Sequence, residues 1–228
     1  FNGANLAGAD LSGANLAGAD LRNAVLVGAK TQSWNVNNTN MDGALTDKPS
    51  GTSVSDLPYQ QMIADHARWI ETGGAEGGPS VFDKADLRNL HSIRGFNLTA
   101  LSAKGAVFYG LDMEGVQMQG AQLDGADLRA CNLRRADLRG ARLKGAKLAG
   151  ADLRDAQLGP LLITADRLLP ADLTGAILTN ADLARADLRQ ARLAGADVSR
   201  ANFTSAQLRD VDLTGAIRLA ARGLDDVI

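Results

Sequence analysis

Residues 126–158 read ADLRA-CNLRR-ADLRG-ARLKG-AKLAG-ADLRD-AQL, so one unit of five residues recurs without interruption. In an extended chain, alternate side chains point the same way, so Ala126 and Leu128 share one face of their segment while Asp127 takes the other. The two positions after each Leu must then turn the chain before the next small residue. A period of five drifts around a 3.6-residue helix and leaves no apolar stripe. The repeat therefore predicts a one-dimensional stack of short straight segments.

The composition agrees with a stack built mainly from Ala and Leu. Hydrophobic residues make up 45% of the 228 residues but aromatic residues only 4%, and the formal net charge is −2. Cys131 is the only cysteine, so no internal disulfide can form and a reducing compartment is allowed. No run of 18 apolar residues occurs, so no segment is expected to span a membrane. We expect a cytoplasmic protein, and the start at Phe1 inside the repeat predicts that the sequence is a fragment.

The repeated unit resembles the A(D/N)LXX motif of the pentapeptide repeat family, as in ANLAG, ADLSG and ADLRN near the N-terminus. The resemblance implies an all-β solenoid: a right-handed quadrilateral β-helix with four repeats per coil and the central Leu stacked along the axis. Central positions run from Phe1 to Thr46 and again from Ile93 to Leu213, where 25 repeats pass without a slip. At about 4.8 Å per coil, the second run gives a rod roughly 30 Å long.

Four repeats per coil would make residues 20 apart neighbours in the stack. Opposite charges at that separation, such as Asp127 with Lys147 and Arg167 with Asp187, are therefore expected to lie side by side.

The pattern divides the chain into four parts. Residues 1–46 form a first pentapeptide repeat array, residues 47–80 a loop plus an amphipathic capping helix, residues 81–218 a second array, and residues 219–228 a C-terminal cap or tail. The expected fold is thus a β-helix interrupted by one α-helical insertion. A one-residue phase change between Leu87 and Ile93 favours two separate rods, while one rod with the helix on its flank is the alternative. Residues 217–224 are expected to form a short helix-like cover for the last coil.

The insertion has the signature of a single helix. Ser55-Asp56-Leu57-Pro58 indicates a helix start, apolar positions recur at helical spacing up to Ile70, and Gly73-Gly74 ends the helix. His66 and Trp69 form an H-x-x-W pattern that resembles the helix just before arrays in bacterial pentapeptide repeat proteins. Because an uncovered first coil invites aggregation, we expect both to belong to a structural cap. A metal-ligand role for His66 is the alternative, but no Cys, Asp or Glu cluster completes a site.

The second array is broken between Gly159 and Pro170. The break is ten residues long, so the phase of the repeat is unchanged beyond it. Asp166 falls where a small residue should point inward, and burial of an unpaired carboxylate is costly, so we expect the segment to bulge out as a loop. The loop is either an exposed contact site for a partner or a seal folded back on the rod. The candidate contact residues are Leu161, Leu162, Leu168 and Leu169.

Catalytic chemistry is not indicated by the pattern. A filled prism offers flat walls rather than a concavity, and no G-x-S-x-G, Walker loop, paired Cys or H-E-x-x-H motif occurs. We therefore expect no enzyme activity, no cofactor and no metal. Cys131 occupies an inner small-residue position and is interpreted as a buried apolar filler.

Two functions remain open at this point. One is a protein-interaction scaffold with an unidentified protein partner. The other is a DNA-mimicking inhibitor or protector of DNA gyrase, which the resemblance to quinolone-resistance pentapeptide proteins would imply. Charge favours the scaffold, because residues 93–218 carry 17 basic and 14 acidic side chains, a net charge of +3. In the quinolone-resistance proteins the C-terminal end of the rod makes a dimer, so a rod end is a candidate homodimer interface here.

Arginines just after the central Leu form a candidate basic wall. Asp is interleaved with them and no aromatic platform accompanies them, so nucleic-acid binding is not expected. The wall residues are Arg129, Arg134, Arg139, Arg154, Arg189 and Arg209.

Overall fold

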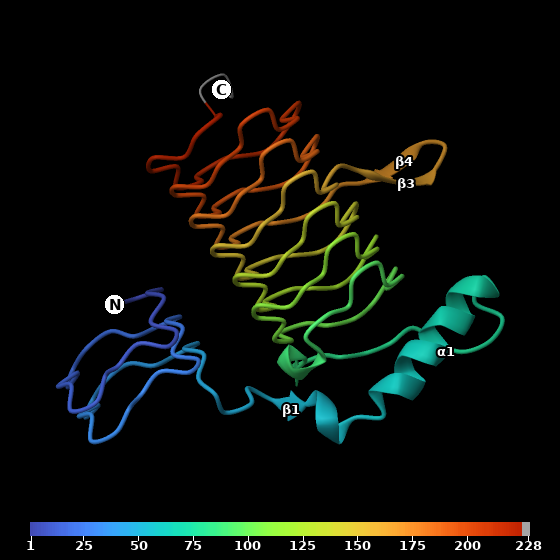
Figure 1. The fold of residues 1–228 in the computed structure, drawn as a ribbon. Helices are drawn as coiled ribbons and strands as arrows, with labels where there is room; N and C mark the ends of the chain where they lie inside the picture. The colour runs from blue at the N-terminus through green and yellow to red at the C-terminus, as the bar shows by residue number, and fades with distance from the viewer. Residues whose placement is uncertain (225–228) are drawn as a thin grey trace. The chain divides into compact units, whose positions relative to one another are not determined.

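The computed structural model describes residues 1–224, and the chain forms two compact units, residues 1–50 and the residues from Gly51 onward (Figure 1). In both units, parallel bridges join residues 20 apart, such as Asn5 with Val25 and Asp127 with Lys147. Each coil therefore contains four five-residue repeats, and the expected Asp127–Lys147 pairing is confirmed. The chain is a solenoid, while the right-handed sense of its coils stays a prediction.

A tight turn closes each repeat. The N–H of Ala151 donates to the carbonyl of Leu148 at 3.0 Å, and Gly150 between them has a φ of 67°. Only residues that tolerate the left-handed region, Gly above all, fit this position well. The outward Asp of the repeat supports the turn that follows it, since the N–H of Arg154 donates to Oδ1 of Asp152 at 3.2 Å. The recurring A-D-L-x-G pattern thus encodes its own turn.

The core of the second unit is a column of stacked side chains. Leu138 and its inner-corner neighbour Ala136 have no exposed surface, and this holds for nearly every central and inner residue from Leu101 to Ala201. The first unit has little more than two coils, so few of its side chains are fully enclosed. The buried residues of the first unit are Leu21, Ala24, Val25, Leu26 and Leu45.

Four ladders of bridged outward residues form the walls of the second unit, and we name each after one member. The Asp152 wall contains Ser92, Asp112, Asn132, Asp152, Asp182, Asn202 and Arg222. The Asp187 wall contains Asn97, Gln117, Asp137, Gln157, Asp187 and Gln207. The Asp172 wall contains Val81, Ser102, Gln122, Arg142, Asp172, Arg192 and Asp212. The Asp127 wall contains Asp86, Val107, Asp127, Lys147, Ile177, Asp197 and Ile217.

The segment before the second array covers its first coil. Strand β1 (Thr52–Ser53) pairs in parallel with β2 (Ala85–Asp86), which extends the Asp127 wall by one strand. A short 3-10 helix, η1 (Val54–Asp56), and helix α1 (Tyr59–Glu71) follow β1. Val54 is buried in the core, and the apolar side chains Leu57, Tyr59, Met62 and Ile63 pack against it.

The phase change after Leu87 is absorbed by a second 3-10 helix, η2 (Arg88–Leu90). Bridges that span it join residues 21 apart, such as Asp86 with Val107, whereas those beyond it return to 20. One extra residue is therefore accommodated locally, and the walls continue in register.

A β-hairpin accounts for the break in the second array. Strands β3 (Leu161–Thr164) and β4 (Arg167–Leu169) pair antiparallel, and across them the bridges join residues 30 apart, such as Gln157 with Asp187. Two of the 25 repeats counted from the sequence are thus hairpin rather than coil. The expected pairing of Arg167 with Asp187 is wrong, because Arg167 pairs with Thr164 inside the hairpin.

The expected helix-like end of the chain is also wrong. Ile217 bridges Asp197 and Arg222 bridges Asn202, so the coil continues four residues beyond the predicted boundary at Arg218. The inner position of this last coil is still held by small residues, Ala216 and Ala221. The rest of the expected tail, residues 225–228, lies outside the described residues.

Candidate interaction surface

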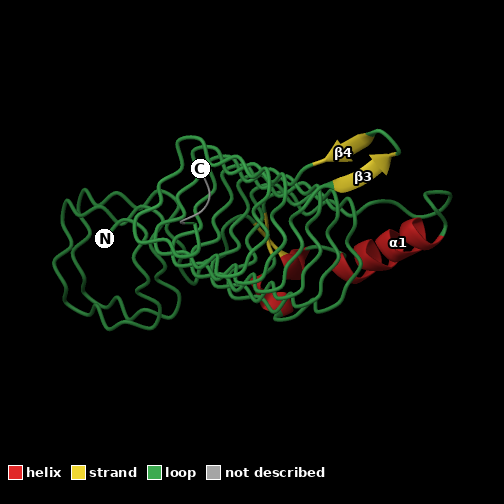
Figure 2. Ribbon diagram, turned by 90° about the horizontal axis from the view of Figure 1, so that it is seen from above, coloured by secondary structure: helices red, strands yellow, loops and turns green. Residues whose placement is uncertain are grey.

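Two elements leave the wall surface of the second unit. The β3–β4 hairpin projects near the middle of the coil stack and α1 projects near its first coil (Figure 1). Seen from above, both extend to the same side of the stack (Figure 2). These two elements therefore interrupt an otherwise regular surface on one side.

One face of the hairpin packs on the rod. A Cβ built on Gly140 would lie 2.8 Å from Cβ of Leu161 and 3.2 Å from Cδ2 of Leu169, so only a residue without a side chain fits beneath them. Leu161 also reaches toward Gly120, one coil earlier. Leu161 and Leu169 are thus half-buried and form the seal that was one of the two interpretations.

The other face of the hairpin is exposed and apolar. Leu162 is 63% exposed, Ile163 46% and Leu168 49%. The four leucines predicted as contact residues therefore divide into two inward and two outward ones. Ile163 completes the outward set, and the sequence analysis missed it. Asp166 lies in the exposed turn between the strands rather than in an inner position.

His66 is the one fully buried residue of α1. Its Nδ1 accepts a hydrogen bond from the backbone N–H of Ser80 at 2.8 Å, and the hydroxyl of Ser80 donates to the carbonyl of Met62 at 2.8 Å. The carbonyl of Ser80 in turn accepts the N–H of Ser102 in the Asp172 wall. Ser80 thus links the helix to the coil stack through three hydrogen bonds.

Trp69 holds the loop that follows α1. Its ring lies 5.8 Å from the His66 ring and beside Gly74, whose N–H donates to the Trp69 carbonyl at 2.8 Å. Gly77 is even closer to the helix, since a Cβ there would lie 2.1 Å from the Asp65 carbonyl oxygen. The glycines that follow the H-x-x-W pattern allow this close approach.

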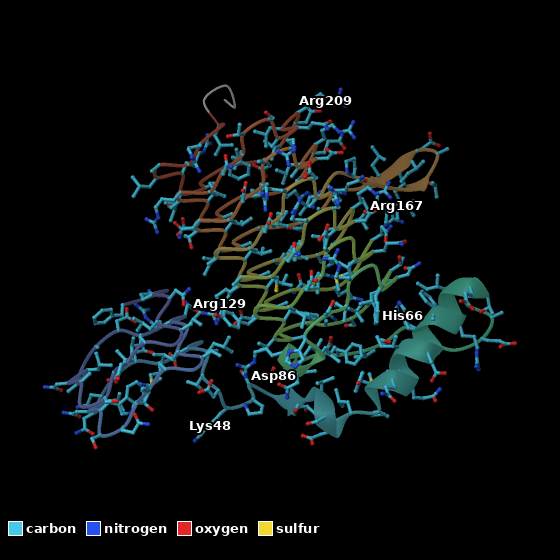
Figure 3. All side chains as sticks on the ribbon, in the orientation of Figure 1. Lys48, His66, Asp86, Arg129, Arg167 and Arg209 are labelled. Carbon is cyan, nitrogen blue, oxygen red and sulfur yellow. The ribbon has the colours of Figure 1, made fainter. Side chains whose placement is uncertain are left out.

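The six arginines of the candidate basic wall do not form one wall. Arg134 and Arg154 follow residues of the Asp152 wall, while Arg139, Arg189 and Arg209 follow residues of the Asp187 wall. Arg129 follows Asp127 on a third wall. Figure 3 labels Arg209 near the C-terminal end of the stack and Arg167 on the hairpin.

Most of these arginines are paired within their own repeat. In Asp-Leu-Arg units the two charged side chains flank the inward Leu on the same face, and the guanidinium bonds the carboxylate at two points. Arg189 donates from Nε to Asp187 at 2.9 Å and from Nη2 at 2.7 Å, which lowers the pKa of that carboxyl. Arg139 pairs with Asp137 in the same way. The same pairing occurs in Asp20–Arg22, Asp86–Arg88, Asp127–Arg129 and Asp152–Arg154.

The Asp152 wall adds pairs between coils. Arg94 contacts Glu114 at 2.7 Å, and Arg185 contacts Asp155 at 2.7 Å across the hairpin insertion. Arg94 and Arg185 beside this wall are therefore paired with carboxylates of a neighbouring coil.

No group of three or more His, Cys, Asp or Glu side chains within residues 1–224 is arranged to hold a metal ion. Cys131 is buried, its thiol donates to the Phe108 carbonyl, and burial raises the pKa of the thiol to about 12. It is therefore a poor nucleophile at neutral pH. In the same part of the chain no helix has the length and apolarity needed to cross a membrane.

The model of the family described as pentapeptide repeats matches residues 1–30, 94–129, 121–159, 171–204 and 181–217, in eight copies. The chain belongs to the pentapeptide repeat family. The matched ranges cover more than half of the chain and omit the α1 segment and the β3–β4 hairpin. These two elements thus lie outside the residues that match the family repeat.

Several solved pentapeptide repeat structures resemble the chain. HetL, involved in heterocyst differentiation regulation in the cyanobacterium Nostoc sp., is 29% identical over 96% of this chain and 90% of its own, with a TM-score of 0.36. Rfr23 from the cyanobacterium Cyanothece is 22% identical over 57% of this chain and 92% of its own, with a TM-score of 0.34. A trypsin-treated variant of QnrB1, a plasmid-mediated fluoroquinolone resistance protein, is 15% identical over 97% of this chain and 83% of its own, with a TM-score of 0.34. A comparison with curated protein sequences finds no match.

Proposed function

We propose that this pentapeptide repeat protein is a non-enzymatic scaffold that binds another protein through its β3–β4 hairpin. The observation that carries the proposal is the hairpin, where three apolar side chains, Leu162, Ile163 and Leu168, are exposed on one projecting element. Exposed apolar clusters on a rigid support are typical of protein contact sites.

The packing of the inward face of the hairpin does not account for the apolar side chains on its outward face. Leu161 and Leu169 already cover the wall at Gly140, so the seal needs neither Leu162 nor Leu168. The outward apolar side chains give no hydrophobic stabilisation while their surface stays in contact with water. A partner that covers the outward face would recover that free energy.

Mimicry of DNA against gyrase is the competing function. A DNA mimic needs a surface of consistent negative charge, whereas residues 93–218 carry a net charge of +3 and their Asp side chains are largely paired with Arg. The scaffold is therefore the better-supported function. A gyrase supercoiling assay separates the two, and inhibition at low protein concentration would favour the mimic.

A hairpin deletion can test the scaffold without disturbing the coil stack. Removal of residues 161–170 restores a spacing of five between central Leu158 and Leu173, because ten residues are two whole repeats. Pro160 would then occupy the turn position where φ is positive, which proline cannot adopt. The deletion therefore needs Pro160→Gly in addition, which leaves the unit AQLGGADL.

The binding experiment compares four tagged proteins at equal loading after chemical cross-linking: the unchanged chain, the hairpin deletion, Leu162→Ser/Leu168→Ser, and Ile217→Ser. Ile217 is 57% exposed and far along the chain from the hairpin, so it controls for loss of any exposed apolar side chain. We expect a specific cross-linked protein with the unchanged chain and Ile217→Ser that both hairpin variants lose. Retention by the hairpin variants, with unchanged melting temperatures, would reject the hairpin as the contact site.

A further inference from the structure

His66 occupies an unusual position for a histidine. It has no exposed surface, it lies where α1 meets the coil stack, and its Nδ1 accepts the Ser80 N–H at 2.8 Å. A neutral imidazole can accept at Nδ1 only when its proton is on Nε2. That Nε2 is buried and has no hydrogen-bond partner among residues 1–224. The site therefore suits the neutral ring, and among the described residues only the Thr99 backbone favours a charged one.

We propose that His66 is a pH-sensitive latch that keeps α1 docked on the first coil when neutral and releases it when protonated. A second proton would have to sit on Nδ1, which faces the Ser80 N–H donor. Two donors would then oppose each other, and the positive charge would be buried without a partner. The link from α1 through Ser80 to Ser102 would break at its first hydrogen bond.

Among residues 1–224, no charged side chain compensates a charge on His66. Asp65 and Arg68 flank His66 along α1, Glu76 lies in the following loop, and the backbone of Thr99 faces it from the rod. Burial lowers the pKa of His66 and the Thr99 backbone raises it by a smaller amount, and no charged side chain in the described part of the chain contributes. Opening α1 to water returns the ring to its ordinary pKa.

The direction of the pH effect follows from this difference. The docked state binds fewer protons than the open state, so docking is complete above the ordinary histidine pKa and weakens as the pH falls below it. With an ordinary pKa of about 6.5, opening at pH 5.0 is favoured by up to about 30-fold relative to pH 8.0. The chain contains only two histidines, His66 and His91, so few other groups titrate in this window.

Hydrogen exchange of the α1 backbone, read by mass spectrometry on residues 59–71 and corrected for intrinsic rates, tests the latch. We expect protection of α1 to fall between pH 7.5 and 5.0 in the unchanged chain. His66→Asn should keep its protection at both pH values, because the amide oxygen can accept the Ser80 N–H but cannot titrate. His91→Asn is the matched control and should behave like the unchanged chain, since His91 is exposed and its φ of 60° suits Asn.

A second measurement does not depend on how His66→Asn folds. In the His91→Asn chain, imidazole NMR signals come from His66 alone, and they should report an Nε2–H ring with a depressed pKa. Constant α1 protection across the pH range, an Nδ1–H ring, or equal loss of protection in His66→Asn would each overturn the latch.

Discussion

Truncation of one central leucine, Leu138→Ala, measures how rigid the coil stack is. Leu138 has no exposed surface and lies between Met118 and Leu158, its fully buried counterparts one coil before and one coil after. The coils cannot move together to fill the space, because backbone hydrogen bonds such as Leu138 N–H to Gln157 O at 2.7 Å fix their separation. Leu-to-Ala changes in cores cost about 2–5 kcal/mol, depending on how far the site collapses. We therefore expect about 4 kcal/mol here.

The assay is unfolding followed by circular dichroism, with Leu162→Ala as the matched control. A loss of about 4 kcal/mol in a unit of this size should lower the melting temperature by about 8–16 °C. Leu162 is 63% exposed, so its truncation should cost under about 0.5 kcal/mol. Equal losses from the two changes, or a loss below about 1.5 kcal/mol from Leu138→Ala, would refute the dry, fixed core.

Three other predictions concern the turns, the hairpin and the ion pairs. Gly150→Ala should cost about 1 kcal/mol in thermal unfolding and Gly150→Asn less, because a Cβ there meets no atom within 4 Å and only the positive φ resists it. Within residues 93–205, trypsin should cut first after Arg167, because Arg167 is exposed on the hairpin while arginines of Asp-Leu-Arg units are held by carboxylates. Mass spectrometry of the fragments will identify the first cut. Asp187→Asn should destabilise the chain at pH 7, and the difference should shrink in denaturation curves as the pH falls below the ordinary aspartate range. The reason is that Arg189 lowers the pKa of Asp187, and the stabilisation is lost as the pH falls through that lowered value.

The inward and outward assignment of each repeat could be predicted because the repeat is short and local. The side chains of Ala126 and Leu128 alternate with that of Asp127 in an extended segment, whatever the rest of the chain does. The Asp-Leu-Arg pairs follow from the same rule, since residues two apart share a face. The separation of Asp127 from Arg129 therefore already indicated a neutral pair, and the candidate basic wall overlooked it.

The break at the hairpin was recognised as a bulge, but the count of 25 repeats still included it, because its length is a multiple of the period. Ten residues preserve the phase, so a count of central positions passes straight through the insertion. Two prolines mark the segment as outside the regular repeat. Pro160 and Pro170 both fall two residues after a nominal central position, where the repeat needs positive φ, and proline cannot supply it. No regular repeat can include either residue in that slot.

The C-terminal coil was missed for a different reason. Residues 217–224 were interpreted as a helix-like piece, and Arg218 occupies a central position there. In the last coil that position is no longer enclosed, so Arg218 is exposed and its Nη2 lies 3.4 Å from the Leu213 carbonyl. A central side chain is therefore buried only where coils lie on both sides of it. The sequence alone does not indicate this until the end of the stack is known.

The regular repeat leaves little for a partner to recognise. Each Asp-Leu-Arg unit buries its own Leu, pairs its own charges and closes its own turn, so these units offer a largely neutral surface. Specific recognition needs positions that are unlike the equivalent positions in the adjacent coils, which lie 20 residues away in the sequence. The β3–β4 hairpin and α1 are such positions, they project to the same side of the stack, and both lie outside the ranges that match the family repeat (Figure 2). A partner that contacts both would be held in one register along the stack, which the walls alone cannot specify.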